Sequence, residues 1–248
     1  MSGHSKWHNI RLKKGRVDQV RGKLFSKLAR EISVAAKEGG GNPEANARLR
    51  AAMERAREAG VPSDNIERSI QRGTGQVEGA TYETITYEGY APGGVAVMVE
   101  VLTDNRNRAA SEIRNLFTKN GGTMSEAGSV AWMFDRKGLI TVDRSKATED
   151  DVLLAALEAG AEDIRTVGDV FEITTPPDQF FGVKQALGAA KIPITSGDLT
   201  MVPKSTVRVE GKEAQQVLRL MEALEDHDDV QHAYANFDIP DEILQQVG

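Results

Sequence analysis

GLITVDRSKATEDDVLLAALEAGAEDIRTVGDVFEITTPPDQFFGVKQALGAAKIPITSGDLTMVP, residues 138–203, is the stretch of sequence that decides the fold. Its apolar residues alternate between the two-residue period of strands and the 3.6-residue period of helices, with Gly, Pro or polar residues between the segments. This order, β-α-β-β-α-β, predicts a ferredoxin-like unit. The six predicted segments are a strand at 139–142, a helix at 148–159, strands at 163–167 and 170–174, a helix at 178–190 and a strand at 194–202.

The segments on either side of this unit predict a second sheet that the unit interrupts. We therefore predict a discontinuous α/β domain of residues 80–137 plus 204–248, with residues 138–203 inserted in its central hairpin. The alternative is three consecutive domains with a boundary near residue 137, which would place fewer strands in complete sheets. The predicted segments are strands at 82–88 and 95–102, a helix at 106–119 and a strand at 129–134, then a strand at 206–209, a helix at 212–225 and a strand at 230–237.

The first 79 residues predict a helical domain. Apolar residues recur at helical spacing, and Gly39-Gly40-Gly41 would end the first helix as a C-cap. Asn42 and Pro43 predict the N-cap and first residue of a second helix, and Asp64 and Glu67 have capping-box spacing for a third. The predicted fold class is α+β: a helical N-terminal domain (1–79) followed by two ferredoxin-like α/β sandwich domains, one inserted in the other.

The composition excludes several classes of chemistry. The 248 residues are 40% hydrophobic and 27% charged, as in ordinary globular proteins, and they include no cysteine. The chain therefore has no disulfide, thiolate metal site or cysteine nucleophile, which fits the reducing cytoplasm. No run approaches the roughly 20 apolar residues of a membrane span, and the basic N-terminus lacks the apolar stretch of a secretory signal. We expect a cytoplasmic protein that binds no membrane.

Charge is distributed unevenly along the chain. Residues 1–75 contain 16 Lys and Arg against 8 Asp and Glu, a net charge of +8, whereas residues 76–248 contain 15 against 29, a net charge of −14. The first 30 residues alone contain nine bases and a single acid, Asp18. Such asymmetry is typical of a protein that binds a polyanion at one end. The alternative is that the basic residues only keep the helices soluble.

The first helix is predicted to carry a row of cations beside its apolar face. At 100° per residue, five of its bases fall within an arc of about 80° that contains no acid, and the apolar stripe is centred about 120° away. One face can then pack on the other helices while the adjacent face contacts a phosphate backbone. The predicted contact residues, which we call the basic ridge, are Arg16, Lys23, Lys27, Arg30 and Lys37.

The segment before this helix is polar and basic. Trp7 offers a flat surface for stacking on an unpaired base, an interaction worth about 1–3 kcal/mol. Its alternative role is a hydrophobic anchor that folds the segment back onto the protein. His4 and His8 have no third ligand nearby, so we expect no metal there. The predicted phosphate contacts of this segment are Lys6, Arg11, Lys13 and Lys14.

A second cationic point lies at Arg106 and Arg108. Asp104 or Asn105 is expected to cap a helix here, which places both arginines in its first turn, where the helix dipole disfavours positive charge. Arginines placed where the helix dipole disfavours them suggest contact with an external anion. The alternative is a salt bridge to one of the many acids of the chain.

No catalytic arrangement emerges from the sequence. Gly73-Thr74-Gly75 lacks the lysine and the spacing of a phosphate-binding loop. Asp226-His227-Asp228-Asp229 resembles a metal-ligand cluster, but its place between a helix and a strand predicts a solvated acidic loop. A metal-dependent nuclease would need carboxylates clustered in a basic cleft, and the carboxylates here are concentrated away from the basic segment. We expect no enzymatic activity, cofactor, metal or small-molecule substrate.

Nine short motifs stand out along the chain: GHSKW (3–7), KLFSKLAREI (23–32), AKEGGGNPEAN (36–46), DNIER (64–68), RGTG (72–75), YEGY (87–90), PGG (92–94), TDNRNR (103–108) and GSV (128–130). They closely resemble those of the YebC/PmpR family, and in this order they are highly specific. The resemblance covers the whole chain, although the last hundred residues match by pattern more than by motif. It implies a three-domain, non-enzymatic regulator. Members are generally labelled DNA-binding transcriptional regulators, mitochondrial relatives are regarded as translational activators, and bacterial members have been connected with ribosomes stalled on proline-rich segments.

The resemblance and the charge pattern together predict a nucleic-acid-binding regulator of gene expression, of the DNA-binding transcriptional type. The alternative is a ribosome-associated translation factor that binds ribosomal RNA and relieves stalls at proline-rich segments, because folded RNA offers unpaired bases and closely spaced phosphates. A row of lysines and arginines gives affinity with little base readout. Specificity for DNA would then come from DNA shape, oligomerisation or a partner protein.

Overall fold

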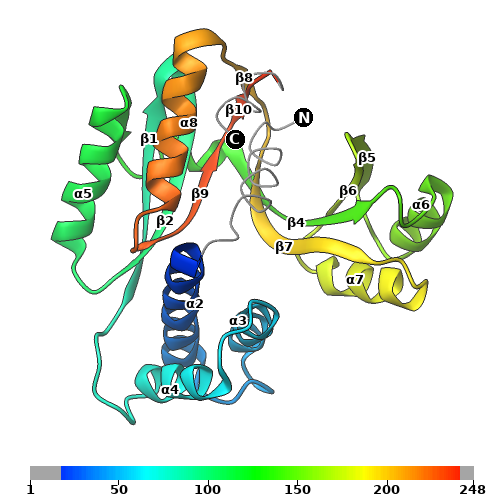
Figure 1. Ribbon diagram of the computed structural model, residues 1–248, viewed down its shortest axis with the longest axis horizontal. Coiled ribbons are helices and arrows are strands. Elements are labelled where there is room, and N and C mark those ends of the chain that lie inside the picture. The colour runs from blue at the N-terminus through cyan, green and yellow to red at the C-terminus, as the bar shows by residue number, and fades with distance from the viewer. Residues whose placement is uncertain (1–17, 241–248) are drawn as a thin grey trace. The chain divides into compact units, whose positions relative to one another are not determined.

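The structure, a computed structural model, describes residues 18–240, with side chains from residue 22 onward (Figure 1). The chain divides into two compact units: residues 1–132 with 205–248 form unit 1, and residues 133–204 form unit 2. The fold class is α+β, as predicted: helices come first, followed by two antiparallel four-stranded sheets with helices packed on them. None of the described helices is long and apolar enough to cross a membrane.

Three helices open the described part of unit 1: α2 (Asp18–Gly39), α3 (Ala47–Glu58) and α4 (Ser63–Gly73). The apolar stripe of α2 is buried at Leu28 and Ile32, whereas Leu24 is exposed. Burying a Leu or Ile side chain contributes about 1.5–3 kcal/mol, so these contacts fix the face that α2 turns toward α3 and α4. The core of the three helices is formed by Leu28, Ile32, Ala35, Ala36, Leu49, Ala52, Met53, Ala56, Val61 and Ile66.

Asn46 connects the end of α2 to the start of α3. Its Oδ1 accepts a hydrogen bond from the Leu49 amide at 3.0 Å, which makes it the N-cap of α3. Its Nδ2 donates to the carbonyls of Ala35 and Gly40, each at 2.8 Å. One buried side chain therefore satisfies free backbone groups of both helices.

Two predicted caps are wrong. Asn42 and Pro43 do not begin α3, because Asn42 Oδ1 instead accepts from the amide two residues later, at 3.0 Å, and forms a turn. Asp64 and Glu67 do not form a capping box, because α4 already begins at Ser63 and Asp64 lies inside its first turn.

The larger sheet of unit 1 is antiparallel, in the order β3-β1-β2-β9. Its strands are β1 (Glu83–Ala91), β2 (Val95–Thr103), β3 (Thr123–Ser125) and β9 (Val230–Ala235), and the helices α5 (Arg106–Lys119) and α8 (Gly211–Glu225) pack against it (Figure 1). β2 is almost entirely buried. The turn that joins β1 to β2 uses Gly93 and Gly94 at φ of 75° and 76°, values that favour glycine. Side chains of β2, α5 and α8 form the main part of its core.

Two strands of unit 1 differ from prediction. The strand predicted at 129–134 is wrong: the edge strand is β3, and a turn and a 3-10 helix (Ala131–Met133) separate it from β4. The predicted strand at 206–209 is reduced to β8 (Val207–Arg208), which pairs in parallel with β10 (Phe237–Asp238) in a separate sheet. In the sheet, β1 and not the predicted strand at 129–134 lies beside β2. The tight turn at 92–94 joins β1 directly to β2, so all nine residues of β1 pair with it.

Unit 2 contains the six elements predicted for it, in the predicted order. They are β4 (Phe134–Asp143), α6 (Glu149–Glu158), β5 (Asp163–Val167), β6 (Val170–Thr175), α7 (Phe180–Ala189) and β7 (Ile194–Pro203). The strand order β5-β6-β4-β7, antiparallel throughout, is the ferredoxin-like order. Along the chain, unit 2 lies between the two segments of unit 1. The further division of unit 1 into a helical domain (1–79) and a discontinuous α/β domain stays a prediction.

Candidate nucleic-acid interface

The predicted nucleic-acid contacts fall in three places. Lys6, Trp7, Arg11, Lys13, Lys14 and Arg16 lie outside the described residues, as do His4 and His8. Lys23, Lys27, Arg30 and Lys37 lie on α2, and Arg106 and Arg108 lie in the first turn of α5.

The described cations of the basic ridge contact the carboxyl end of α8 and the loop that follows it. Lys23 Nζ donates to the carbonyl of Asp226 at 3.1 Å, and Lys27 Nζ donates to that of Glu225 at 2.5 Å. Arg30 donates to the carbonyl of Asp228. The last carbonyls of a helix have no partner within the helix and carry the negative end of its dipole. Because α8 has no basic residue in its own last turn, α2 supplies the positive charge.

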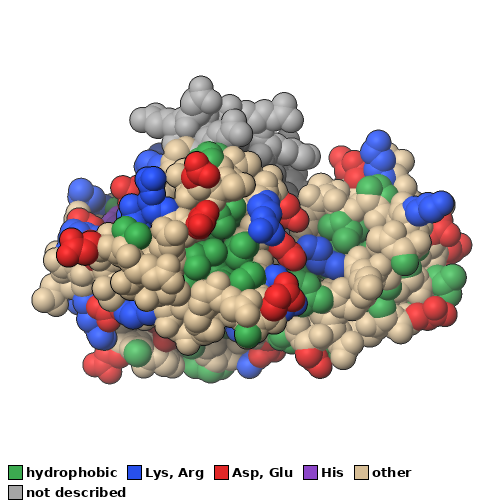
Figure 2. Space-filling model, turned by 90° about the horizontal axis from the view of Figure 1, so that it is seen from below, with side chains coloured by type: hydrophobic (Ala, Val, Ile, Leu, Met, Phe, Trp, Pro, Cys, Tyr) green, Lys and Arg blue, Asp and Glu red, His purple; other side chains and the backbone are tan. Residues whose placement is uncertain are grey.

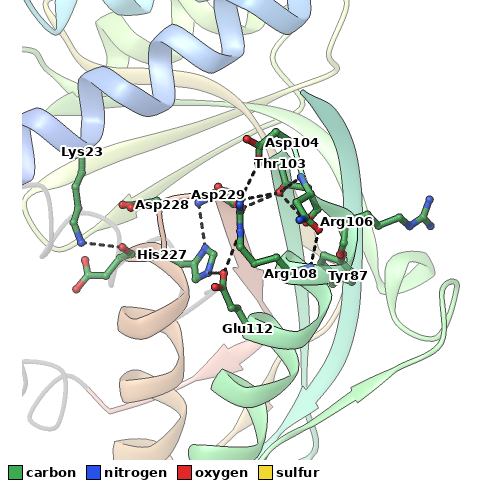
Figure 3. Close-up of polar contacts among 12 residues, drawn as sticks. Lys23, Tyr87, Thr103, Asp104, Arg106, Arg108, Glu112, His227, Asp228 and Asp229 are labelled. Atoms are coloured by element: carbon green, nitrogen blue, oxygen red, sulfur yellow. Dashed lines mark hydrogen bonds and ion pairs between the residues drawn. The ribbon is translucent and has the colours of Figure 1, made fainter. Parts of the chain in front are cut away.

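Asp229, directly after these carbonyls, is a buried carboxylate that joins three elements (Figure 3). It accepts hydrogen bonds from Arg30 at 3.0 Å, Thr103 Oγ1 at 2.9 Å and Arg108 at 2.7 Å. Burial raises the pKa of Asp229, but the bonds from Arg108 and Thr103 and the positive charge of Arg30 outweigh it, so the pKa lies below its ordinary value. The prediction that 226–229 is a solvated acidic loop is therefore wrong for Asp229.

The two arginines of α5 have different surroundings. Arg108 pairs with Asp229 and, at 3.0 Å, with Asp104. The hydrogen bond to Asp229 raises the pKa of Arg108. The salt-bridge alternative thus holds for Arg108. Arg106 is exposed and its side chain extends away from this network (Figure 3), so its contact with an external anion stays a prediction. Asn105 caps α5 by accepting from the Arg108 amide, as one of the two predicted caps.

A cavity of about 530 Å³ lies beside Asp229, and its lining has both signs of charge. Glu112 lies 2.9 Å from His227 Nε2, and His227 Nδ1 accepts from the amide of Asp229 at 3.1 Å. Lys23, Arg30 and Arg108 line the same cavity but already bond to protein oxygens. The cavity therefore does not have the lining of a phosphate site.

Lys37, the last residue of the predicted ridge, donates weakly to the carbonyl of Tyr82 at 3.5 Å. The guanidinium carbon of Arg30 lies 5.4 Å from the centre of the Tyr82 ring. The segment leading into β1 thus shares the same cationic face of α2. The sequence did not indicate Tyr82 or Glu112, because Lys37 and His227, with which they interact, lie far away along the chain.

Other cations of the helical part are exposed. Arg57 at the end of α3, and Arg68 and Arg72 on α4, are exposed, although none was predicted as a contact. On the face shown in Figure 2, Lys and Arg side chains are interspersed with Asp and Glu side chains. Across the described residues, no group of three or more His, Asp or Glu has the arrangement of a metal site.

Comparison with known proteins assigns the chain to a family. Residues 5–76 match the TACO1/YebC protein N-terminal domain, and residues 82–237 match the TACO1/YebC second and third domain. A protein of Natranaerobius thermophilus named "Probable transcriptional regulatory protein" is 56% identical over 99% of each chain, and one of Dictyoglomus thermophilum with the same name is 58% identical over the whole of both chains. The crystal structure of a conserved hypothetical protein from Aquifex aeolicus matches with a TM-score of 0.82 and 50% identity, covering 91% of this chain and 93% of that one. These matches confirm the resemblance indicated by the sequence motifs, and the chain belongs to the TACO1/YebC family.

Proposed function

We propose that this protein is a non-enzymatic regulator of transcription that binds DNA through its N-terminal segment and helix α2. The observation that carries the proposal is the separation of charge, +8 over residues 1–75 against −14 over the remainder. Each phosphate that a cation neutralises releases condensed counterions, so cations concentrated at one end favour binding there. The name shared by the full-length relatives supports a role in transcription. A cytoplasmic location, where bacterial DNA and ribosomes both occur, is part of the proposal.

Three cations of the basic ridge on α2 already have partners within the protein. Because Lys23, Lys27 and Arg30 bond to the end of α8 and to the loop after it, they reach a phosphate only by giving up or sharing those bonds. The principal contacts are therefore assigned to the five bases before α2. Arg57, Arg68, Arg72 and Arg106, which are exposed, add to the positive field. The bases before α2 are Lys6, Arg11, Lys13, Lys14 and Arg16.

One observation favours a second candidate, a ribosome-associated factor that binds ribosomal RNA and acts on stalls at proline-rich segments. The ridge on α2 is not a free row of cations that could follow a straight duplex. A short basic segment with one Trp suits folded RNA better, because such RNA presents unpaired bases beside closely spaced phosphates.

The test replaces Lys6, Arg11, Lys13 and Lys14 together by Gln in the full chain and measures affinity for duplex DNA and for RNA against salt concentration. Each lost contact should lower the slope of log affinity against log salt by about 0.9 for duplex DNA and about 0.7 for a single strand. We therefore expect a slope reduced by about 3–4 on DNA if all four residues contact phosphates.

The matched control removes four exposed bases from elsewhere: Lys119, Arg136, Lys146 and Lys212, each changed to Gln. It alters the net charge equally, so an equal loss of slope in both variants would refute a dedicated N-terminal interface. The two candidate functions separate on the physiological partner. Co-sedimentation with ribosomal subunits that disappears on deletion of residues 1–14 supports the second, whereas recovery of DNA alone after crosslinking in cells supports the first.

A further inference from the structure

The loop of residues 126–132, which follows β3 and includes the start of the 3-10 helix Ala131–Met133, is held in place by a buried acid. Glu88 of β1 is only 4% exposed, and its carboxylate accepts three backbone hydrogen bonds from this loop. The donors are the amides of Gly128 at 2.7 Å, Val130 at 2.6 Å and Ala131 at 2.8 Å. Burial raises the pKa of Glu88, but these three bonds outweigh it and leave the pKa below its ordinary value. The loop thus has a fixed backbone, which three amides bonded to one charge make rigid.

Trp132, at the end of this loop, is held by its neighbours yet lies largely in solvent. Its Nε1 donates to the carbonyl of Ser129 at 3.1 Å, and Tyr90 Oη donates to the same carbonyl at 3.3 Å. Val130 is fully buried and anchors the loop. The Trp132 residue is nevertheless 64% exposed. A large aromatic ring is therefore displayed in a defined orientation, without the ordering cost that a mobile side chain would incur on binding.

The chemistry of the Trp132 ring limits the kinds of group that it can bind. Its one polar group is already bonded to Ser129, so the ring offers only its faces. Leu24 and Val77, the other large apolar side chains exposed in the described part of unit 1, belong to α2 and to the segment after α4. A protein interface needs a contiguous apolar centre, whereas a single exposed ring is enough to stack on one planar group such as a base.

We propose that Trp132 is a stacking platform for one unpaired base of the bound nucleic acid. The inference rests on the proposed function in that it requires a nucleic-acid partner, and it adds a contact far from the N-terminal segment in the sequence. It also specifies the form of the ligand: a single strand, loop or melted region, because bases inside a duplex have no free face.

The experiment uses the full chain with Trp7→Phe, which leaves Trp132 as the only tryptophan. The probes are a mixed-sequence single-stranded RNA and a fully paired DNA duplex. We expect saturating RNA to quench Trp132 fluorescence and to protect it from iodide. On the background with native Trp7, Trp132→Ala should weaken RNA binding about 5- to 150-fold, the equivalent of 1–3 kcal/mol. Trp132→Phe, which keeps a ring, should lose less.

The control is Leu154→Ala, which removes an apolar side chain that is 65% exposed on α6 and should leave affinity unchanged. Far-ultraviolet circular dichroism checks that each variant folds. Two results together overturn this inference but not the proposed function: RNA binds Trp132→Ala with full affinity, and RNA bound to the Trp7→Phe variant leaves Trp132 open to iodide. A wild-type chain that binds neither probe in dilute salt overturns both. Protection of Trp132 by RNA-free ribosomal proteins, but not by RNA, would make it a protein contact and also overturns the inference.

Discussion

Asp229 shows how one residue can define the relation between distant segments. Its buried carboxylate accepts from Arg30 of α2, from Thr103 at the end of β2 and from Arg108 of α5. The side chain of Arg30 is 21% exposed and that of Arg108 is 43% exposed, so both can recover part of their hydration if the carboxylate is removed. Buried charges are stabilising only when their partners are in place. Asp229 therefore stabilises the fold only while all three partners donate to its carboxylate.

We predict that Asp229→Asn lowers the free energy of unfolding at pH 7 by about 1–3 kcal/mol, because an amide donor would face the donors of two arginines. The pKa of Asp229 is lowered in the folded state. Its stabilisation is therefore present above the unfolded pKa of about 3.9 and is lost as pH falls through the folded pKa. Urea unfolding at several pH values should show the gap between wild type and variant closing below about pH 4.

The control for that measurement is Asp228→Asn, an exposed change at the neighbouring position. It should cost no more than about 0.5 kcal/mol, as surface substitutions usually do. Equal losses in the two variants would mean that the bonds to Arg30, Thr103 and Arg108 contribute nothing specific.

At the scale of elements, α2 completes the electrostatics of α8. The carboxyl end of α8 and the loop that follows it present three carbonyls to α2 cations. The row of bases that suggested a phosphate contact in the sequence thus has a partner within the protein. Stabilisation of α8 and binding of a phosphate would use the same charges, since a carbonyl oxygen and a phosphate oxygen can each accept from the same ammonium group.

The double variant Lys23→Gln with Lys27→Gln distinguishes a role in stabilising α8 from a role in binding nucleic acid. Each cation at a helix end contributes about 0.3–1 kcal/mol, so the double variant should lose about 0.6–2 kcal/mol of stability in urea unfolding at low salt, and less at high salt. Lys119→Gln with Lys212→Gln removes the same charge from exposed sites. Lys119 lies in the last turn of α5, where a cation is favoured, and Lys212 lies in the first turn of α8, where a cation is disfavoured, so the two effects have opposite signs. That control should be neutral. A stability loss with unchanged nucleic-acid affinity would assign both lysines to α8, whereas lost affinity with unchanged stability would assign them to the ligand.

At the scale of the whole molecule, short-range patterns predicted the fold well. The six elements of unit 2 follow from periodicities within a few residues, and the apolar stripe of α2 is buried at Leu28 and Ile32. The N-cap of α3 was harder to predict, because Asn42 and Asn46 are both residues that cap helices well. The bonds of Asn46 to the carbonyls of Ala35 and Gly40 distinguish the two, and they depend on the packing of α2 against α3. The pairing of α2 with 225–229 was beyond prediction, since these residues lie about two hundred positions apart. The N-terminal contacts stay predictions.

The acidic remainder should also influence binding of a polyanion. Residues 76–248 have a net charge of −14, so their field opposes the approach of DNA or RNA to the basic end. Changing Glu149, Asp150 and Asp178, all exposed on unit 2, to Gln or Asn should therefore raise affinity in dilute salt. The Debye length falls from about 30 Å at 0.01 M salt to about 8 Å at 0.15 M, so the gain should shrink as salt is added. Fluorescence anisotropy with labelled DNA and RNA measures the gain in affinity and its dependence on salt. A gain that persists at 0.5 M salt would show that these acids act by local contact with the ligand rather than through the long-range field.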